Sequence, residues 1–356
     1  MRTITSAMRT TTKLAPSVMC TLALILLTTA RAAAQNVLAK IPIPATSAGG
    51  QVVVNRGLNR VYVSAGFSSG GTLTVINGKT LTVLTTLSNS NGVNWDVKND
   101  NFWTGNLSGG QVLTYSGSTN TQINANTVGF CPGETAFDCL NRQFWVGAQC
   151  GAGNDPLFLF DADTFAPIAG PIATGGTMGP IIVSPATSAK LYVESGGVSK
   201  EVNPSTFAVT PTGFGTVLAV DQHKNKLFAI SGNNLQIIGA GTDKVEVTVP
   251  LSYTPGRQIG VNNAIRHIYL LNQAANKIEI RAITAVNNPN DVRGQLIGTF
   301  SLGAGNTPVG VAADSVRGLV YVVVNNSGSC SVWVIEDLTS ARTCGFSVSK
   351  GNGGGE

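Results

Sequence analysis

The chain has 356 residues, of which 12% are charged and 43% are hydrophobic, with 42 glycines and 15 prolines. This apolar content excludes a globally disordered chain, and the scarcity of helix-forming residues at helical spacing excludes a helical bundle. The formal net charge is +5, but four basic residues and no acidic residue lie before residue 35, so the remainder carries 19 basic and 18 acidic residues. Net charge therefore disfavours nucleic acid as a partner.

Residues 1–34 have the pattern of a cleavable signal peptide. A basic start is followed by the apolar run Val18–Leu27, which is shorter than a membrane-spanning helix requires. Ala32–Ala34 then supplies the small residues of a signal-peptidase site, so cleavage is predicted before Gln35. The alternative is a retained anchor. We expect a secreted or periplasmic protein without a transmembrane anchor after processing.

A repeat runs through the chain that follows. In each unit a turn-forming residue precedes, by seven positions, an aromatic residue that begins a β-rich run. The turn residues are Asn55, Asp96, Asp138, Pro185, Asp221, Asn262 and Asp314. The aromatic residues are Tyr62, Trp103, Trp145, Tyr192, Phe228, Tyr269 and Tyr321. They recur at intervals of 36 to 52 residues, which is typical of β-propeller blades.

Each unit predicts four strands, and the seventh lacks chain for its fourth. An apolar run such as QVVVN predicts the inner strand, the aromatic run the second, and a run such as TLTVIN the third. The segment NVLAKIPIP, after the leader, resembles an isolated fourth strand. We therefore predict an all-β, seven-bladed propeller over residues 35–346, closed by this N-terminal strand. Because the seven aromatic residues occupy equivalent positions, we expect them to pack between blades rather than to contact a ligand. The glycine-rich residues 347–356 are predicted to be disordered.

The repeat resembles the YVTN β-propeller family, also called YncE-like or surface-layer-related propellers. The segments NRVYVSAG, TLTVIN and VLAKIPI match the family unit best, and LYVESGG, IYLLNQ and VYVVVNN match it more loosely. The resemblance covers roughly residues 35–345. It is specific for fold and weak for function, and it implies an extracytoplasmic protein with a binding or cell-surface role.

Five cysteines follow the leader, and export permits disulfides. Facing residues of an antiparallel hairpin have numbers with a constant sum. Applied to the third and seventh units, this rule predicts the disulfides Cys131–Cys150 and Cys330–Cys344 and leaves Cys139 free. The competing pairing is Cys139–Cys150, since sequence does not fix connectivity.

Recognisable catalytic motifs are absent from the sequence. There is no nucleophile elbow, metalloprotease motif or phosphate loop, and the only histidines are His223 and His267. Both are expected to be exposed turn or strand residues. The cysteine spacing does not fit a zinc site. No catalytic residue, metal site or cofactor is predicted.

The segments that lead into the inner strands contain few charged groups. Glu134 and Arg257 stand out among them, and Trp95 offers a stacking surface. Because such loops from several blades converge at one channel mouth, Trp95, Glu134 and Arg257 are the candidates for a small-ligand site. The alternative is simple surface exposure.

Three functions are compatible with these features. The first is a non-enzymatic binding or interaction protein, a monomer, whose partner is an envelope or extracellular protein, a glycan or a small ligand. The second is an enzyme resembling propeller lactonases or streptogramin-type lyases, whose sites need several converging acids, histidines or metal ligands. The third is a nucleic-acid-binding propeller, which needs clustered basic and aromatic residues. The sequence favours the first.

Overall fold

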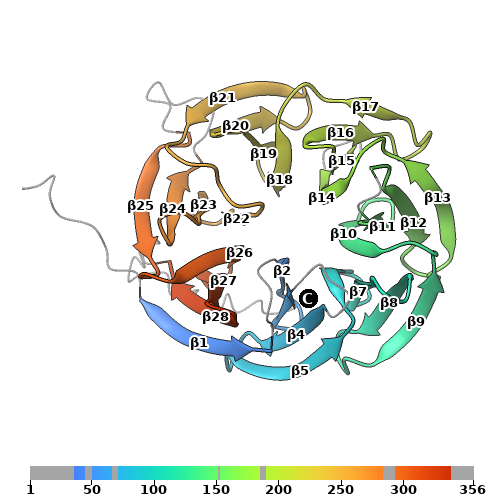
Figure 1. Ribbon diagram of the computed structural model, residues 1–356, viewed down its shortest axis with the longest axis horizontal. Helices are drawn as coiled ribbons and strands as arrows, with labels where there is room; N and C mark the ends of the chain where they lie inside the picture. Colours follow the sequence, from blue (N-terminus) through green and yellow to red (C-terminus); the bar gives the residue numbers. More distant parts are fainter. Residues whose placement is uncertain are drawn as a thin grey trace, which may run out of the picture. The chain divides into compact units, whose positions relative to one another are not determined.

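The computed structural model describes residues 36–44, 50–65, 71–150, 153–184, 190–283 and 293–337, all in the compact unit Gln35–Glu356. These residues form 28 strands and no helix, and so include no helix long and apolar enough to cross a bilayer. The strands build seven four-stranded antiparallel sheets arranged as a ring (Figure 1). The prediction of an all-β, seven-bladed propeller is confirmed.

The first three blades follow the chain from the inner strand outward. Blade 1 contains β2 (Val52–Asn55), β3 (Arg60–Ala65), β4 (Thr72–Asn77) and β5 (Thr82–Ser88). Blade 2 contains β6 (Asn91–Trp95), β7 (Asn101–Asn106), β8 (Gln111–Ser116) and β9 (Gln122–Thr127). Blade 3 contains β10 (Pro132–Asp138), β11 (Gln143–Ala148), β12 (Pro156–Asp161) and β13 (Pro167–Ala173).

The next three blades repeat this order. Blade 4 contains β14 (Met178–Ser184), β15 (Lys190–Ser195), β16 (Val198–Val202) and β17 (Val209–Pro211). Blade 5 contains β18 (Thr216–Asp221), β19 (Lys226–Ser231), β20 (Asn234–Gly239) and β21 (Lys244–Pro250). Blade 6 contains β22 (Ile259–Asn262), β23 (His267–Asn272), β24 (Lys277–Ala282) and β25 (Leu296–Ser301).

Blade 7 combines strands from distant parts of the chain. It contains β26 (Asn306–Asp314), β27 (Leu319–Asn326), β28 (Ser329–Glu336) and β1 (Val37–Ile43). Strand β1 pairs antiparallel with β28, outside it in the ring (Figure 1). Ile41 and Ile43 are buried in the same cluster as Val332 and Val334. The predicted closure by the N-terminal strand is confirmed.

The turns between first and second strands share one local structure. Each described turn residue accepts a hydrogen bond from a backbone N–H two or three positions later, because a short Asn or Asp side chain can reach it. The fourth residue after it is left-handed, with φ between 50° and 66°; these residues are Asn59, Asp100, Arg142, Asn225, Arg266 and Gly318. Pro185, the remaining turn residue, lies outside the described residues.

The seven repeated aromatic residues all pack in the core. Each is at most 1% exposed. Tyr62 of blade 1 meets Phe102 of blade 2 with ring centroids 4.6 Å apart, and Trp103 of blade 2 stacks on Phe144 of blade 3 at 4.4 Å. None of them lines the cavity at the mouth of the central channel. The interpretation of these rings as packing between blades is therefore confirmed.

The cysteines are placed as follows. Cys131 and Cys150 form a disulfide with their Cα atoms 5.2 Å apart, which is the pairing that the hairpin register predicts. Cys139 is exposed and free, so the competing pairing Cys139–Cys150 is wrong. Cys344 lies outside the described residues, and the Cys330–Cys344 disulfide stays a prediction.

The predicted leader, residues 1–34, and the predicted tail, residues 347–356, also lie outside the described residues.

Candidate functional site

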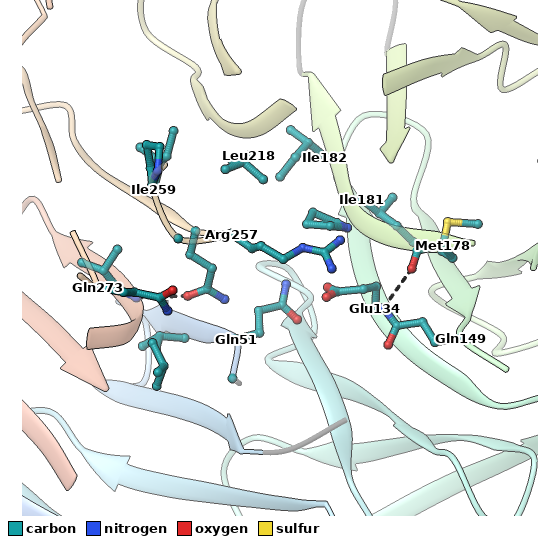
Figure 2. A pocket seen from close by; sticks show the side chains of 18 of the residues that line it. Gln51, Glu134, Gln149, Met178, Ile181, Ile182, Leu218, Arg257, Ile259 and Gln273 are labelled. Atoms are coloured by element: carbon teal, nitrogen blue, oxygen red, sulfur yellow. Dashed lines mark hydrogen bonds between the residues drawn. The ribbon is translucent and has the colours of Figure 1, made fainter. Parts of the chain in front are cut away.

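The antiparallel order of each blade brings the start of its inner strand and the end of its second strand to the same mouth of the channel. A cavity of about 710 Å³ lies at this mouth (Figure 2). Its lining comes from every blade except blade 2. We call it the mouth cavity.

One wall of the mouth cavity is aliphatic. The inner strands run side by side along the channel, and their aliphatic side chains at this end are buried, except Ile182, which is half-buried. They are Val52, Ile181, Ile182, Leu218, Ile259 and Val311. Such a wall removes apolar ligand surface from water, which is the main favourable contribution to binding in a concave site.

Four glutamines line the cavity and tie one blade to the next. Gln51 and Gln258 accept hydrogen bonds from the backbone N–H groups of Val93 (2.8 Å) and Val311 (3.0 Å). Gln149 and Gln273 donate to the backbone carbonyls of Met178 (3.4 Å) and Pro308 (3.1 Å). The remaining amide atoms have no partner among the described residues. They are Nε2 of Gln51 and Gln258 and Oε1 of Gln149 and Gln273. Each glutamine thus keeps one donor or acceptor for a ligand.

Glu134 is the buried acid of the mouth cavity. It lies on β10 and is only 8% exposed. No described residue donates a hydrogen bond to its carboxylate, which points into the cavity (Figure 2). Burial raises the pKa of Glu134 to about 7; Arg257 opposes this shift through space and Glu194 adds to it. The carboxyl group is therefore half protonated near neutral pH.

Arg257 is already engaged by a second acid. Its guanidinium donates to the carboxylate of Glu194, at the end of β15. The Arg257 side chain is 68% exposed, whereas that of Glu194 is 13% exposed. Gly179 makes room for this ion pair, because a Cβ at that position would overlap both side chains.

Asp155 is the other acid in the lining. It is 2% exposed, and its Oδ2 accepts the Met178 backbone N–H at 3.0 Å. A buried carboxylate needs such donors. Asp155 therefore orders the start of β14, which carries Met178 and Ile181 into the cavity.

The structure brings two of the three predicted site residues together. Glu134 and Arg257 line the same cavity, whereas Trp95 does not. Trp95 is the last residue of β6, opposite Phe102, and packs against the cluster around Tyr62 and Phe102. It therefore lies at the other end of its strand from the mouth cavity.

Sequence reasoning missed the residues that the second strands contribute. Gln149 and Gln273 each follow the repeated aromatic residue by four positions, and Glu194 follows Tyr192 by two. Because the second strand returns antiparallel to the first, polar residues just after each aromatic residue reach the same mouth. That spacing would have identified them.

His267 lies away from the mouth cavity, in a buried pair. It faces Asn262 at the far end of β22, and its Nδ1 is 3.2 Å from Asp337 Oδ2. The Tyr269 hydroxyl donates to the same carboxylate. The expectation of an exposed His267 is wrong because Asp337 gives the ring a buried partner, while His223 is exposed as expected. Among the described residues, no three His, Cys, Asp or Glu side chains are grouped to hold a metal ion.

Comparison with known proteins supports the fold. No protein-family model and no curated protein sequence matches the chain. It is similar to the β-propeller domain of Cps50 (Swd1) from Myceliophteria thermophila, with a TM-score of 0.64 and 11% identity over 84% of this chain and 99% of that one. It is also similar to a chain in a crystal structure of the Mitotic Checkpoint Complex, with a TM-score of 0.65 and 13% identity over 95% and 99% of the two chains. At these identities the likeness shows a β-propeller fold and nothing of the ligand.

Proposed function

We propose that the protein is an extracytoplasmic, non-enzymatic binding protein of the YVTN-like type, and that it holds its ligand in the mouth cavity. Glu134 carries the proposal: a buried carboxylate without a hydrogen-bond donor faces a cavity with an aliphatic wall. Buried polar groups are nearly always satisfied, so one that is open to a cavity favours a ligand that completes it. The unpartnered amide atoms of the four glutamines can make further hydrogen bonds to the ligand.

The charge of the cavity argues against the nucleic-acid alternative. Among the residues that the structure describes, Arg257 is the only cationic one in the lining, and Glu194 pairs with it. Glu134 and Asp155 add negative charge on the same surface. A polyanion would meet repulsion there rather than the basic groove that single strands need.

Ligand binding is tested by methyl NMR of the isoleucines, with four probes: the Nα-acetyl amides of lysine, glutamate and norleucine, and N-acetylglucosamine. At least one probe is expected to shift Ile181, Ile182 and Ile259, which line the cavity, and to leave Ile123 and Ile168 of the outer strands unchanged. L218W, which fills the cavity, should abolish the shift. Absence of any shift at millimolar probe would contradict the proposal.

The enzyme alternative has its own outcome. A carboxyl group with a pKa near neutrality can also transfer protons. Lactone hydrolysis by the purified protein that is lost in E134Q, with the fold intact, would favour the lactonase or lyase alternative. The binding proposal expects no turnover from either protein.

Export is tested on the full chain expressed in a bacterial host. Mature protein in the periplasm or medium, with Gln35 as its first residue by mass spectrometry, is the expected result, because residues 1–34 have the pattern of a cleavable leader. A chain lacking residues 1–34 should stay in the cytoplasm. Intact chain in the membrane fraction would instead indicate a retained anchor.

A further inference from the structure

Acids outnumber bases around the mouth cavity. Glu134 and Asp155 line it and Glu194 lies at its edge, whereas Arg257 is the one cationic residue among the described parts of the lining. Glu194 holds Arg257 in an ion pair, and Asp155 accepts the Met178 backbone N–H. Only Glu134 has no donor among the described residues. The unmet requirement of the site is therefore a positively charged hydrogen-bond donor.

A second acceptor lies next to Glu134. Gln149 uses its Nε2 on the Met178 carbonyl, which leaves its Oε1 without a partner. That oxygen packs against Gly133, where an added Cβ would come within 2.7 Å of it. Figure 2 shows Gln149 beside Glu134. An ammonium or guanidinium group has donors for both oxygens.

The wall beside these acceptors suits an aliphatic stem. Ile181, Ile182, Leu218 and Ile259 line the same cavity as Glu134 and Gln149 and give it an apolar surface (Figure 2). Lysine and arginine side chains bury their methylene stems against such surfaces and carry the charge at the tip. A small hydrated ion would leave this wall unused.

From this arrangement we infer that the mouth cavity binds an aliphatic cation of the lysine or arginine type, with the cationic tip donating to Glu134 and Gln149 and the stem against Ile181 and Ile182. This inference rests on the proposed function, since it names the ligand class of the same cavity. It predicts the opposite charge preference from a site built around Arg257.

Proton linkage gives the inference a distinctive pH dependence. Arg257 and Glu194 act on Glu134 through space, Asp155 lines the same cavity, and burial raises the pKa of Glu134 to about 7. Binding a cation requires the ionised carboxylate, so affinity should rise with pH. About one-tenth of Glu134 is ionised at pH 6 and about nine-tenths at pH 8, which predicts roughly tenfold tighter binding at pH 8. A carboxylate ligand that accepts from protonated Glu134 would show the reverse trend.

The test is calorimetric titration of the intact protein with Nα-acetyl-lysine amide and Nα-acetyl-arginine amide at pH 6 and pH 8. E134Q keeps the size of the side chain but removes its charge, and should weaken binding at pH 8 by about tenfold or more, since a hydrogen bond between charged groups is lost. E201Q, on β16 outside the cavity, loses the same charge and should bind as wild type. Matching thermal melts show that both variants are folded.

The remaining probes separate this inference from the proposed function. Binding of the glutamate or norleucine amide, but neither cation, would overturn the inference and leave a binding protein. Cation binding that is equal in E134Q and wild type would also overturn it. A capped Ala-Lys-Ala peptide that binds more tightly than the lysine amide would support a cation presented by a partner protein, and equal affinity would support a free amine.

Discussion

Replacing Trp103 with alanine should destabilise the protein by about 3–5 kcal/mol, the range for truncating a large aromatic residue in a packed core. The Trp103 ring is fully buried on β7 and stacks on Phe144 of the next blade at 4.4 Å. Phe160 and Phe165 also contact it, at centroid distances of 5.8 and 5.7 Å. Alanine would leave a cavity between two blades, which chemical denaturation would detect as a lower unfolding midpoint.

Trp103→Phe is the matched control. Phe228 occupies the equivalent position of blade 5, so a phenyl ring fits this part of the repeat. The Trp103 Nε1 is buried without a hydrogen bond, so phenylalanine loses no polar contact. W103F should therefore cost much less than W103A. Equal stability of W103A and wild type would show that this ring does not hold the blades together.

The second large effect is expected from Arg142→Met, which removes the cation of an ion network between blades 2 and 3. Arg142 donates to both carboxylate oxygens of Asp96, at 2.6 and 2.5 Å, and to Asp163 at 2.7 Å. Asp96 has no exposed surface. Removing one partner of a buried pair typically costs about 3–5 kcal/mol, because the remaining charge stays buried. Thermal and denaturant melts measure the loss.

Two controls isolate this mechanism. Lys98 also faces Asp163, at 3.5 Å, but is 63% exposed, so K98M should cost less than about 1 kcal/mol. The double variant D96N/R142M should recover most of the stability, because Asn55 and Asn262 fill the equivalent turn position in blades 1 and 6. A double variant as unstable as R142M would mean that the arginine acts through packing rather than charge.

The fold could be predicted from sequence because one local rule repeats. An Asn or Asp that caps its own turn, followed seven residues later by a buried ring, places both residues by short-range forces that a single sequence displays. Closure by β1 was also predictable, since an isolated outer-strand pattern needs a sheet edge to pair with.

The site was only partly predictable because it depends on which ends of strands meet. Glu134 and Arg257 stood out as charges in an uncharged context, which sequence can show. Trp95 was predicted at the mouth of the channel, but it is the last residue of β6. A few residues along a strand are enough to carry a side chain from one end of the channel to the other. The partnership of Arg257 with Glu194 joins positions 63 residues apart in different blades, and no local pattern signals it.

Pairing of β1 with β28 sets a condition on synthesis. Val37 faces Ile335 in the completed ring, so β1 must wait, unpaired, until the ribosome has made the chain as far as β28. Its exposed backbone is a template for other chains during that interval. A chain broken off before β28 would lack the partner for β1, and quality-control proteases would encounter an open edge. The ring can therefore close only after β28 has been translated.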